Sequence, residues 1–121
     1  MELTVVIVNY NVKYYLAQCL QSVLRATRAI ETEIWIVDNA STDGSETYIK
    51  SRFPEATYVY NTENVGFARA CNQAIRKTSG RYVLLLNPDT IVGEDTLKQA
   101  LRFMNDHPET GAAGWTPAVA S

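Results

Sequence analysis

The chain has 121 residues, of which 46% are hydrophobic and 20% are charged, a balance typical of one folded domain and not of a disordered chain. The net charge of −2 gives no overall field that would attract nucleic acid, so no nucleic-acid partner is expected. No apolar run approaches membrane-spanning length, and the first ten residues lack the flanks of a signal peptide. We therefore expect no transmembrane segment and a cytoplasmic protein, either free or peripheral at the inner membrane face.

The first apolar run, Leu3–Val8, is continuous and rich in β-branched residues, which predicts a strand buried on both faces. Asn11 follows it as an expected helix cap, and apolar residues at helical spacing predict a helix from there to about Arg28. The run Glu33–Val37 predicts a second buried strand, which ends at Asp38.

The next helix is expected to begin with a capping-box-like pair, Asp43 and Glu46, and to run to about Phe53, before Pro54. A third strand is expected at Thr57–Tyr60. The sequence thus continues the alternation of strand and helix.

The third helix follows a polar loop at 62–66, and Gly80 is expected to cap its C-terminal end. Its apolar face is expected to consist of Phe67, Cys71, Ala74 and Ile75. Because Cys71 and also Cys19 fall on apolar helix faces, we expect reduced core cysteines and neither a disulfide framework nor a metal site.

The run Tyr82–Leu86 contains five apolar or aromatic residues in succession, which predicts a fourth strand buried on both faces. A fourth helix is expected before Pro108, and Gly111–Trp115 is compatible with the start of a fifth strand. The apolar positions of this fourth helix are Leu97, Ala100, Leu101 and Met104.

Alternating strands and helices predict an α/β fold with a doubly wound, mainly parallel, Rossmann-like sheet and helices on both faces. The expected strand order is about 3-2-1-4, with the winding reversed between the first and fourth strands. Ligands of such sheets bind beyond the carboxyl ends of the strands at that reversal. Asp38 after the second strand and Asp89 after the fourth are therefore expected to open into one shared crevice.

Several ligand classes are disfavoured by missing motifs. The segment after the first strand, NYNVKY, contains no glycine, so neither a dinucleotide fingerprint nor a phosphate-binding P-loop is present. A response-regulator receiver would need an acid pair in the same place. An acid after the second strand suits a base or ribose, and an acid after the fourth suits Mg²⁺ or Mn²⁺. This pattern favours a nucleoside diphosphate held between Asp38 and a metal ion on Asp89.

Four segments in this order resemble a known family: VVIVNYN, VDNASTDGS, NVGFARACNQAI and YVLLLNPD. The resemblance extends from Leu3 to about Gly114 and is to the inverting family-2 glycosyltransferases with the GT-A fold. Within them, the chain is most similar to the branch of rhamnosyl- and galactofuranosyl-type transferases of bacterial surface polysaccharides. This resemblance implies transfer of a sugar from a UDP- or dTDP-type nucleotide-diphosphate sugar to a saccharide or lipid-linked acceptor, with Mn²⁺ or Mg²⁺ as cofactor.

The resemblance also implies roles for individual residues. Val8 and Tyr10 would line the base pocket, and Asp38 would accept a hydrogen bond from a pyrimidine ring. Asn64 and Gly66 match the loop that flanks the nucleotide.

Two positions depart from the family pattern. The common acid pair after the second strand is Asp38-Asn39 here, and the D-x-D metal motif is Asn87-Pro88-Asp89. Asp89 is therefore the one expected metal carboxylate, with Asn87 among the nucleotide-binding residues. One carboxylate suffices if water and diphosphate complete the metal shell, but metal binding without nucleotide is expected to be weak.

In this family the catalytic base lies downstream, in the half that builds the acceptor site, and no residue up to Ser121 is assigned that role. We therefore expect residues 1–121 to form a single nucleotide-sugar-binding domain that lacks the acceptor half and is inactive alone. The alternative is a non-catalytic nucleotide-sugar-binding module or assembly subunit. A nucleotidyltransferase is less favoured, because NYNVKY lacks a glycine- and arginine-rich loop. The apolar edge of the fourth strand is expected to be masked by C-terminal residues or by a second copy in a homo-oligomer.

Overall fold

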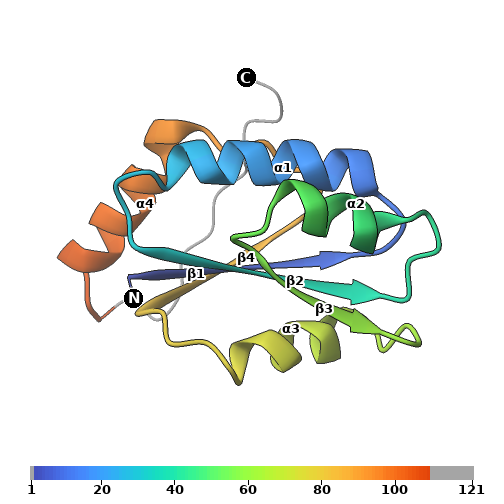
Figure 1. Cartoon of the computed structure of the whole chain (residues 1–121). Helices are drawn as coiled ribbons and strands as arrows, with labels where there is room; N and C mark the ends of the chain where they lie inside the picture. Colours follow the sequence, from blue (N-terminus) through green and yellow to red (C-terminus); the bar gives the residue numbers. More distant parts are fainter. Residues whose placement is uncertain (1, 110–121) are drawn as a thin grey trace.

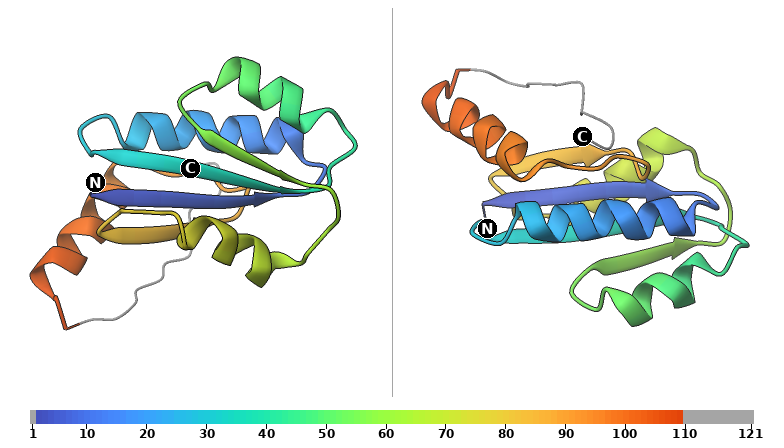
Figure 2. Two further views of the ribbon diagram at one scale, coloured as in Figure 1. Left: turned by 60° about the horizontal axis from the view of Figure 1, so that its bottom comes forward. Right: turned by 90° about the horizontal axis from the view of Figure 1, so that it is seen from above.

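The computed structural model of the protein describes residues 2–109, in which four strands and four helices alternate (Figure 1). The elements are β1 Leu3–Asn9, α1 Lys13–Ala26, β2 Thr32–Asn39, α2 Ser45–Arg52, β3 Thr57–Asn61, α3 Phe67–Ile75, β4 Tyr82–Leu86 and α4 Glu94–Asp106. All strand pairs are parallel, in the order β3-β2-β1-β4, which confirms the predicted fold class and order. β1 lies between β2 and β4 in the middle of the sheet (Figure 2).

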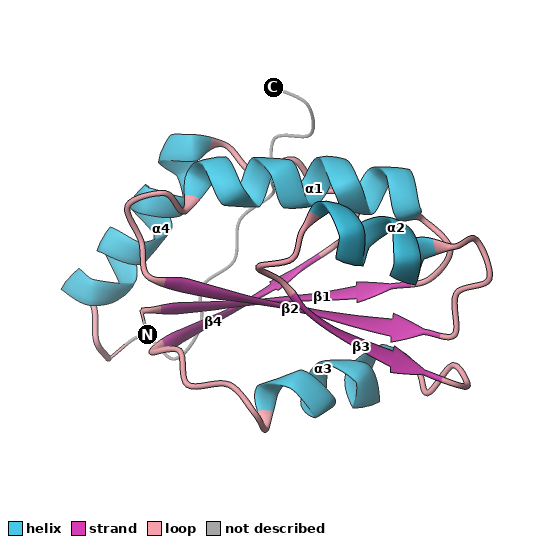
Figure 3. Ribbon diagram, in the orientation of Figure 1, coloured by secondary structure: helices cyan, strands magenta, loops and turns pink. Residues whose placement is uncertain are grey.

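The helices form a layer on each face of the sheet (Figure 3). α1, α2 and α4 cover one face, and α3 lies alone on the other. Alternate residues of β1 serve the two faces, because successive side chains of a strand point in opposite directions. Leu3, Val5 and Ile7 pack in the larger core with α1, whereas Val6 packs against Ala70 of α3.

The outer strands are not buried on both faces, contrary to the prediction from their apolar runs. Val83 of β4 is 41% exposed and Leu85 is 47% exposed. Both are in register with Thr4 and Val6 of β1, so they lie on the face that carries α3. α3 packs mainly on β1 and β2, and within residues 2–109 its nine residues do not cover this face of β4. β3 also contains no fully buried residue.

Asn11 does not cap α1 as predicted. The N-cap position is occupied by Val12, without a side-chain hydrogen bond. Asn11 has a φ of 54°, and its Oδ1 accepts a hydrogen bond from the backbone N–H of Thr42 at 2.7 Å. The asparagine therefore joins two loops at the carboxyl edge of the sheet.

Asp43 fulfils the capping role for two helices at once. Its Oδ2 accepts from the backbone N–H of Lys13 at 3.1 Å, and its Oδ1 accepts from the backbone N–H of Ser45 at 3.0 Å. Both donors belong to first helical turns, whose N–H groups lack partners within the helix. Asp43 does not form the predicted capping box with Glu46, because Gly44 and not Asp43 is the N-cap residue of α2.

The expected limits of α3 also need correction. The helix ends at Ile75, so Gly80 is not its C-terminal cap. Gly80 instead approaches β1 closely, and a Cβ built there would lie 2.6 Å from the backbone nitrogen of Thr4. Phe67 and Ile75, predicted to be buried, are 59% and 37% exposed.

The remaining expectations concern the C-terminal part and the cysteines. α4 ends at Asp106, close to the predicted stop at Pro108, whereas the expected fifth strand from Gly111 lies outside the described residues. Cys19 and Cys71 are buried and unpaired, as predicted. Within residues 2–109, no helix is long and apolar enough to cross a membrane.

Candidate functional site

The carboxyl ends of β1, β2 and β4 meet at one edge of the sheet. Asn9 of β1 is in register with Asp38 of β2, and Ile7 of β1 is in register with Leu86, the last residue of β4. With β1 between them, β2 and β4 are separated by two strand spacings, about 10 Å. Asp38 and the turn that carries Asp89 therefore lie at the same edge, where the sequence predicted them.

Asp38 is enclosed by the protein and does not open into a crevice. Its side chain has no exposed surface, and it lies on the face covered by α1 and α2. Oδ1 accepts from the backbone N–H of Ser41 at 2.8 Å, and Oδ2 accepts from the hydroxyl of Tyr58 and from Nδ2 of Asn9 at 3.5 Å. The expectation of an accessible carboxylate at this position is wrong, because the chain itself supplies the donors.

Tyr58 is suited to remain a donor to this carboxylate. Burial raises the pKa of its hydroxyl, and the hydrogen bond to Asp38 and the charge of Asp38 raise it further. The hydroxyl is therefore protonated throughout the physiological pH range. The contact fixes the end of β2 to β3.

Asn9 is not among the predicted site residues, although it is the most unusual polar group at this edge. It is fully buried, and its Nδ2 donates to Oγ of Ser41 at 3.3 Å as well as to Asp38. Its Oδ1 has no hydrogen-bond partner among the described residues. An unpaired buried carbonyl oxygen costs about 1–3 kcal/mol, which marks a position where an ordered water or a ligand donor belongs. The available signal was a polar residue at the last core-facing position of an apolar strand.

A second polar network holds the loop before α3. Nδ2 of Asn39 donates to the carbonyl of Gly66 at 3.2 Å, and Oδ1 of Asn39 accepts from Asn61 at 3.1 Å. Asn61 and Gln73 exchange two amide hydrogen bonds of 2.8 and 3.1 Å. Asn64 is exposed, and its Oδ1 accepts from the N–H of Gly66, whose φ of 87° favours glycine. The predicted nucleotide loop is therefore anchored to the sheet end, with Asn64 at its surface.

The two residues expected to line the base pocket do not meet Asp38 directly. Val8 packs with Val6 against the α3 side of the sheet, whereas Asp38 faces the α1 side. Tyr10 follows β1 and is 54% exposed. Of this group, the structure therefore leaves Tyr10 accessible and separates Val8 from Asp38 by the sheet itself.

Asp89 lies in a tight turn directly after β4. The N–H of Thr90 donates to the carbonyl of Asn87 at 3.0 Å, which closes the turn. Asn87 and Asp89 are both exposed, whereas Thr90 is buried. The turn therefore presents an amide and a carboxylate to solvent at the carboxyl edge.

Two residues of α1 contact the segment that contains this turn. Sγ of the buried Cys19 lies 3.8 Å from the carbonyl oxygen of Asn87 as a weak donor, and Oγ of the buried Ser22 accepts from the N–H of Val92 at 3.0 Å. Burial, together with the nearby charge of Asp89, raises the pKa of Cys19 to about 12. The thiol is therefore protonated at neutral pH and packs as a donor, not as a nucleophile.

The oxygen atoms of this turn suit a hard cation whose remaining coordination positions are filled by a bound substrate and water. Within residues 2–109, no group of three or more histidine, cysteine, aspartate or glutamate side chains is arranged to hold a metal. Mg²⁺ commonly binds proteins through one or two carboxylates, with phosphates and water supplying the other ligands. Asp89 can supply that carboxylate, and Asn87, two residues before it in the same turn, is also exposed.

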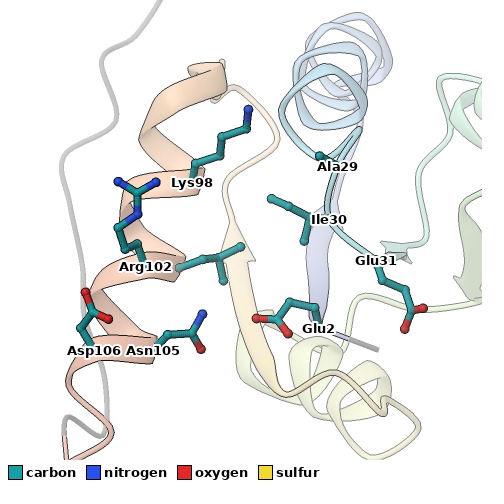
Figure 4. A pocket seen from close by; sticks show the side chains of 9 residues that line it. Glu2, Ala29, Ile30, Glu31, Lys98, Arg102, Asn105 and Asp106 are labelled. Atoms are coloured by element: carbon teal, nitrogen blue, oxygen red, sulfur yellow. The ribbon is translucent and has the colours of Figure 1, made fainter.

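A groove of about 640 Å³ lies at the opposite, amino edge of the sheet, between α4 and the end of α1 (Figure 4). Lys98 and Arg102 of α4 line one side of it, and Glu2 and Ile30 line the other. Because Glu2 precedes β1, this groove is a full strand length away from Asp89. It is not the predicted nucleotide site.

A sequence model of the family described as "Glycosyl transferase family 2" matches residues 4–121. The chain belongs to this family. Among its relatives, the putative teichuronic acid biosynthesis glycosyltransferase TuaG of Bacillus subtilis is 35% identical over 104 residues, which are 84% of this chain and 41% of TuaG. The minor teichoic acid biosynthesis protein GgaB of the same organism is 29% identical over 88% of this chain and 12% of its own length.

Solved structures agree with this family 2 membership. Residues 1–349 of TarS from S. aureus superpose with a TM-score of 0.77 at 25% identity, over 89% of this chain and 33% of that one, and a complex of it with UDP superposes equally well. A Pyrobaculum calidifontis mannosyltransferase bound to GDP-Man and Mn²⁺ has a TM-score of 0.76 at 27% identity, over 85% of this chain and 32% of that one. The family 2 chain described here thus spans well under half the length of these proteins.

Proposed function

We propose that this chain is the nucleotide-sugar-binding domain of an inverting, metal-dependent glycosyltransferase. In the proposed reaction a sugar passes from a nucleotide-diphosphate sugar to a saccharide or lipid-linked acceptor. Membership of family 2 supports the reaction class. As the chain covers only part of its relatives, we place the acceptor half and the catalytic base outside it and expect residues 1–121 to be inactive alone.

The single observation that carries the proposal is the exposed Asp89 at the reversal of the sheet. It follows β4, beside β1, in a segment that α1 contacts through Cys19 at Asn87 and through Ser22 at Val92. Ligands of doubly wound sheets bind at this position, and oxygen ligands suit Mg²⁺ and Mn²⁺. A cation bound there would stabilise negative charge on the departing diphosphate.

The other residues of the site would bind and orient the nucleotide. Asn64 and Gly66 belong to the anchored loop next to the carboxyl edge, and Tyr10 is exposed at the end of β1. We assign Asn87 to the nucleotide as well, since it shares the turn of Asp89. Asp38 would act in binding through the shape of the loop that it holds at Ser41.

The names of the relatives support a choice of donor and acceptor. Structures of TarS contain UDP and UDP-GlcNAc, which favours UDP over dTDP as the nucleotide. Relatives are named for teichoic acid, teichuronic acid and poly(ribitol-phosphate), so we propose an anionic cell-surface polymer as the acceptor. None of these names mentions rhamnose or galactofuranose, and that branch stays a prediction from the sequence alone.

The test is calorimetric titration of UDP with and without Mn²⁺ into the wild type, Asp89→Asn and Asp106→Asn. Asp106 is another exposed acid, at the amino edge, and controls for charge. We expect Mn²⁺ to strengthen UDP binding to the wild type and the control. Asp89→Asn should lose that gain, about 10- to 100-fold, which corresponds to about 1.5–3 kcal/mol for a lost charged contact. Equal Mn²⁺ dependence in all three proteins would refute the metal assignment.

The second candidate is a nucleotide-sugar-binding module without catalysis. Both candidate functions predict binding of the nucleotide sugar, but only the transferase predicts its turnover. Slow hydrolysis of UDP-GlcNAc by the full-length protein, abolished by Asp89→Asn, would support the transferase. Tight metal-dependent binding without any turnover would support the module.

A further inference from the structure

A groove of about 310 Å³ lies along α3, on the side of the sheet opposite to α1. We call it the α3 groove and define it by its lining residues, Val65, Arg69, Asn72, Gln73 and Arg76. It contains two guanidinium groups and two amides, and no acidic side chain lines it. This composition is suited to an anion, in contrast to the net charge of −2 of the whole chain.

The arginines of the α3 groove are available to a ligand. Arg69 and Arg76 are exposed, and in residues 2–109 no hydrogen bond or ion pair engages either guanidinium group. Planar guanidinium groups bind phosphate oxygens in pairs, which gives both affinity and direction. Asn72, also exposed, adds a further donor between them.

One side chain of the same face of α3, Gln73, is fixed by hydrogen bonds. Gln73 exchanges two hydrogen bonds with Asn61 at the end of β3, and Asn61 also donates to Asn39 of β2. The amide of Gln73 is therefore held in place before any ligand arrives. Preorganised donors lower the ordering cost of binding.

The spacing of the arginines suits a chain of anions. They are seven residues apart on one helix, which is about 10 Å along its axis and nearly two full turns. The N-terminal end of α3 adjoins Gly66 in the predicted nucleotide loop. A polymer held along α3 thus leads toward the carboxyl edge of the sheet.

We propose that the α3 groove binds successive phosphodiester groups of an anionic polyol-phosphate chain, the acceptor class named in the proposed function. The inference rests on that proposed function for the identity of the polymer. It adds a second site, separate from Asp89, in which Arg69 and Arg76 each bind one phosphodiester and Asn72 donates between them. Binding there would hold the acceptor polymer while its reacting unit reaches the sugar donor.

The test uses the whole chain and a synthetic ribitol-phosphate oligomer as the probe, at low ionic strength. Binding is measured by calorimetry for the wild type, Arg69→Gln/Arg76→Gln and the control Arg25→Gln/Arg28→Gln. The control removes the same charge from exposed arginines at the end of α1, on the other face of the sheet. UDP affinity and thermal unfolding are measured for each protein, so that a folding defect or a failed nucleotide site is recognised separately.

We expect the α3 variant to bind the oligomer about tenfold more weakly than the wild type, with UDP affinity and unfolding unchanged. The control should stay within about twofold of the wild type. Inorganic phosphate should bind far more weakly than the oligomer, because it can occupy only one arginine at a time. Equal weakening in both double variants, no weakening in either, or no binding of the oligomer to the wild type would each overturn the site. Loss of UDP binding with intact oligomer binding would count only against the proposed function.

Discussion

Three donors of the chain surround the carboxylate of Asp38, and no cation is among them. The N–H of Ser41, the hydroxyl of Tyr58 and the amide of Asn9 converge on it from three different segments. A buried charge is tolerated when hydrogen bonds replace water around it. At the scale of single residues, Asp38 therefore stabilises the fold whether or not it also contacts a nucleotide.

We expect Asp38→Ala to lower the free energy of unfolding by about 3 kcal/mol, since it leaves the N–H of Ser41 and the hydroxyl of Tyr58 unpaired in the interior. Tyr58→Phe should cost less, about 1.5–3 kcal/mol, because only one charged hydrogen bond is lost. Urea unfolding at pH 7 measures both. An Asp38→Ala protein as stable as the wild type but unable to bind UDP would contradict this view and favour a direct contact with the base.

At the scale of elements, α1 and α2 begin on a shared acceptor. Asp43 satisfies the backbone N–H groups of Lys13 and Ser45, which open the two helices. Burial alone would raise the pKa of Asp43, but the hydrogen bonds from Ser45 and Lys13 outweigh it and lower the pKa. The loop at the carboxyl edge is fixed by this connection between two helix N-termini.

Asp43→Ala is expected to lower the free energy of unfolding by about 1–2 kcal/mol at neutral pH, through the loss of a cap. Because the folded-state pKa of Asp43 is lowered, its contribution is complete above the unfolded pKa of about 4 and is lost as the pH falls through the folded pKa. The difference in unfolding free energy between wild type and variant should therefore be constant from about pH 5 to 7 and shrink below about pH 4. A difference that grows on acidification would exclude this linkage.

At the scale of the whole molecule, the sheet is asymmetric. The face under α1, α2 and α4 contains the larger core, whereas α3 packs mainly on β1 and β2. Val83 and Leu85 of the edge strand β4 remain exposed on the α3 face. An edge strand with exposed apolar side chains favours association with another polypeptide segment or a second copy of the chain. The predicted masking by C-terminal residues concerns positions outside the described part of the chain.

We predict that the isolated chain self-associates through β4. Leu85→Lys should shift sedimentation velocity profiles toward the monomer and change the free energy of unfolding little, by about 0.5 kcal/mol or less, because the side chain is already half exposed. Phe103→Lys on α4 is the matched control, as Phe103 has the same exposure of 47%. A wild-type chain that stays monomeric at all concentrations would remove the need for a partner at this edge.

Gly80 and the polar clusters show what the sequence could not specify. Gly80 was predicted as a helix cap, a local role, but its closest neighbour is Thr4, 76 residues away in the chain. Likewise, Asn9 and Tyr58 meet Asp38 only because the strand register brings them together. Long-range contacts of this kind depend on register and packing, which periodicity does not encode.

The sequence by itself determined the alternation of strands and helices, the parallel order of the sheet and the edge at which polar residues gather. These follow from local periodicity and from the handedness of crossover connections, which act on any chain with this pattern. Only the tertiary structure decided which acid is open: Asp89 lies on an exposed turn after an edge strand, and Asp38 lies beneath two helices. Accessibility is set by which elements cover a position, and that depends on the length and packing of helices far away in the chain.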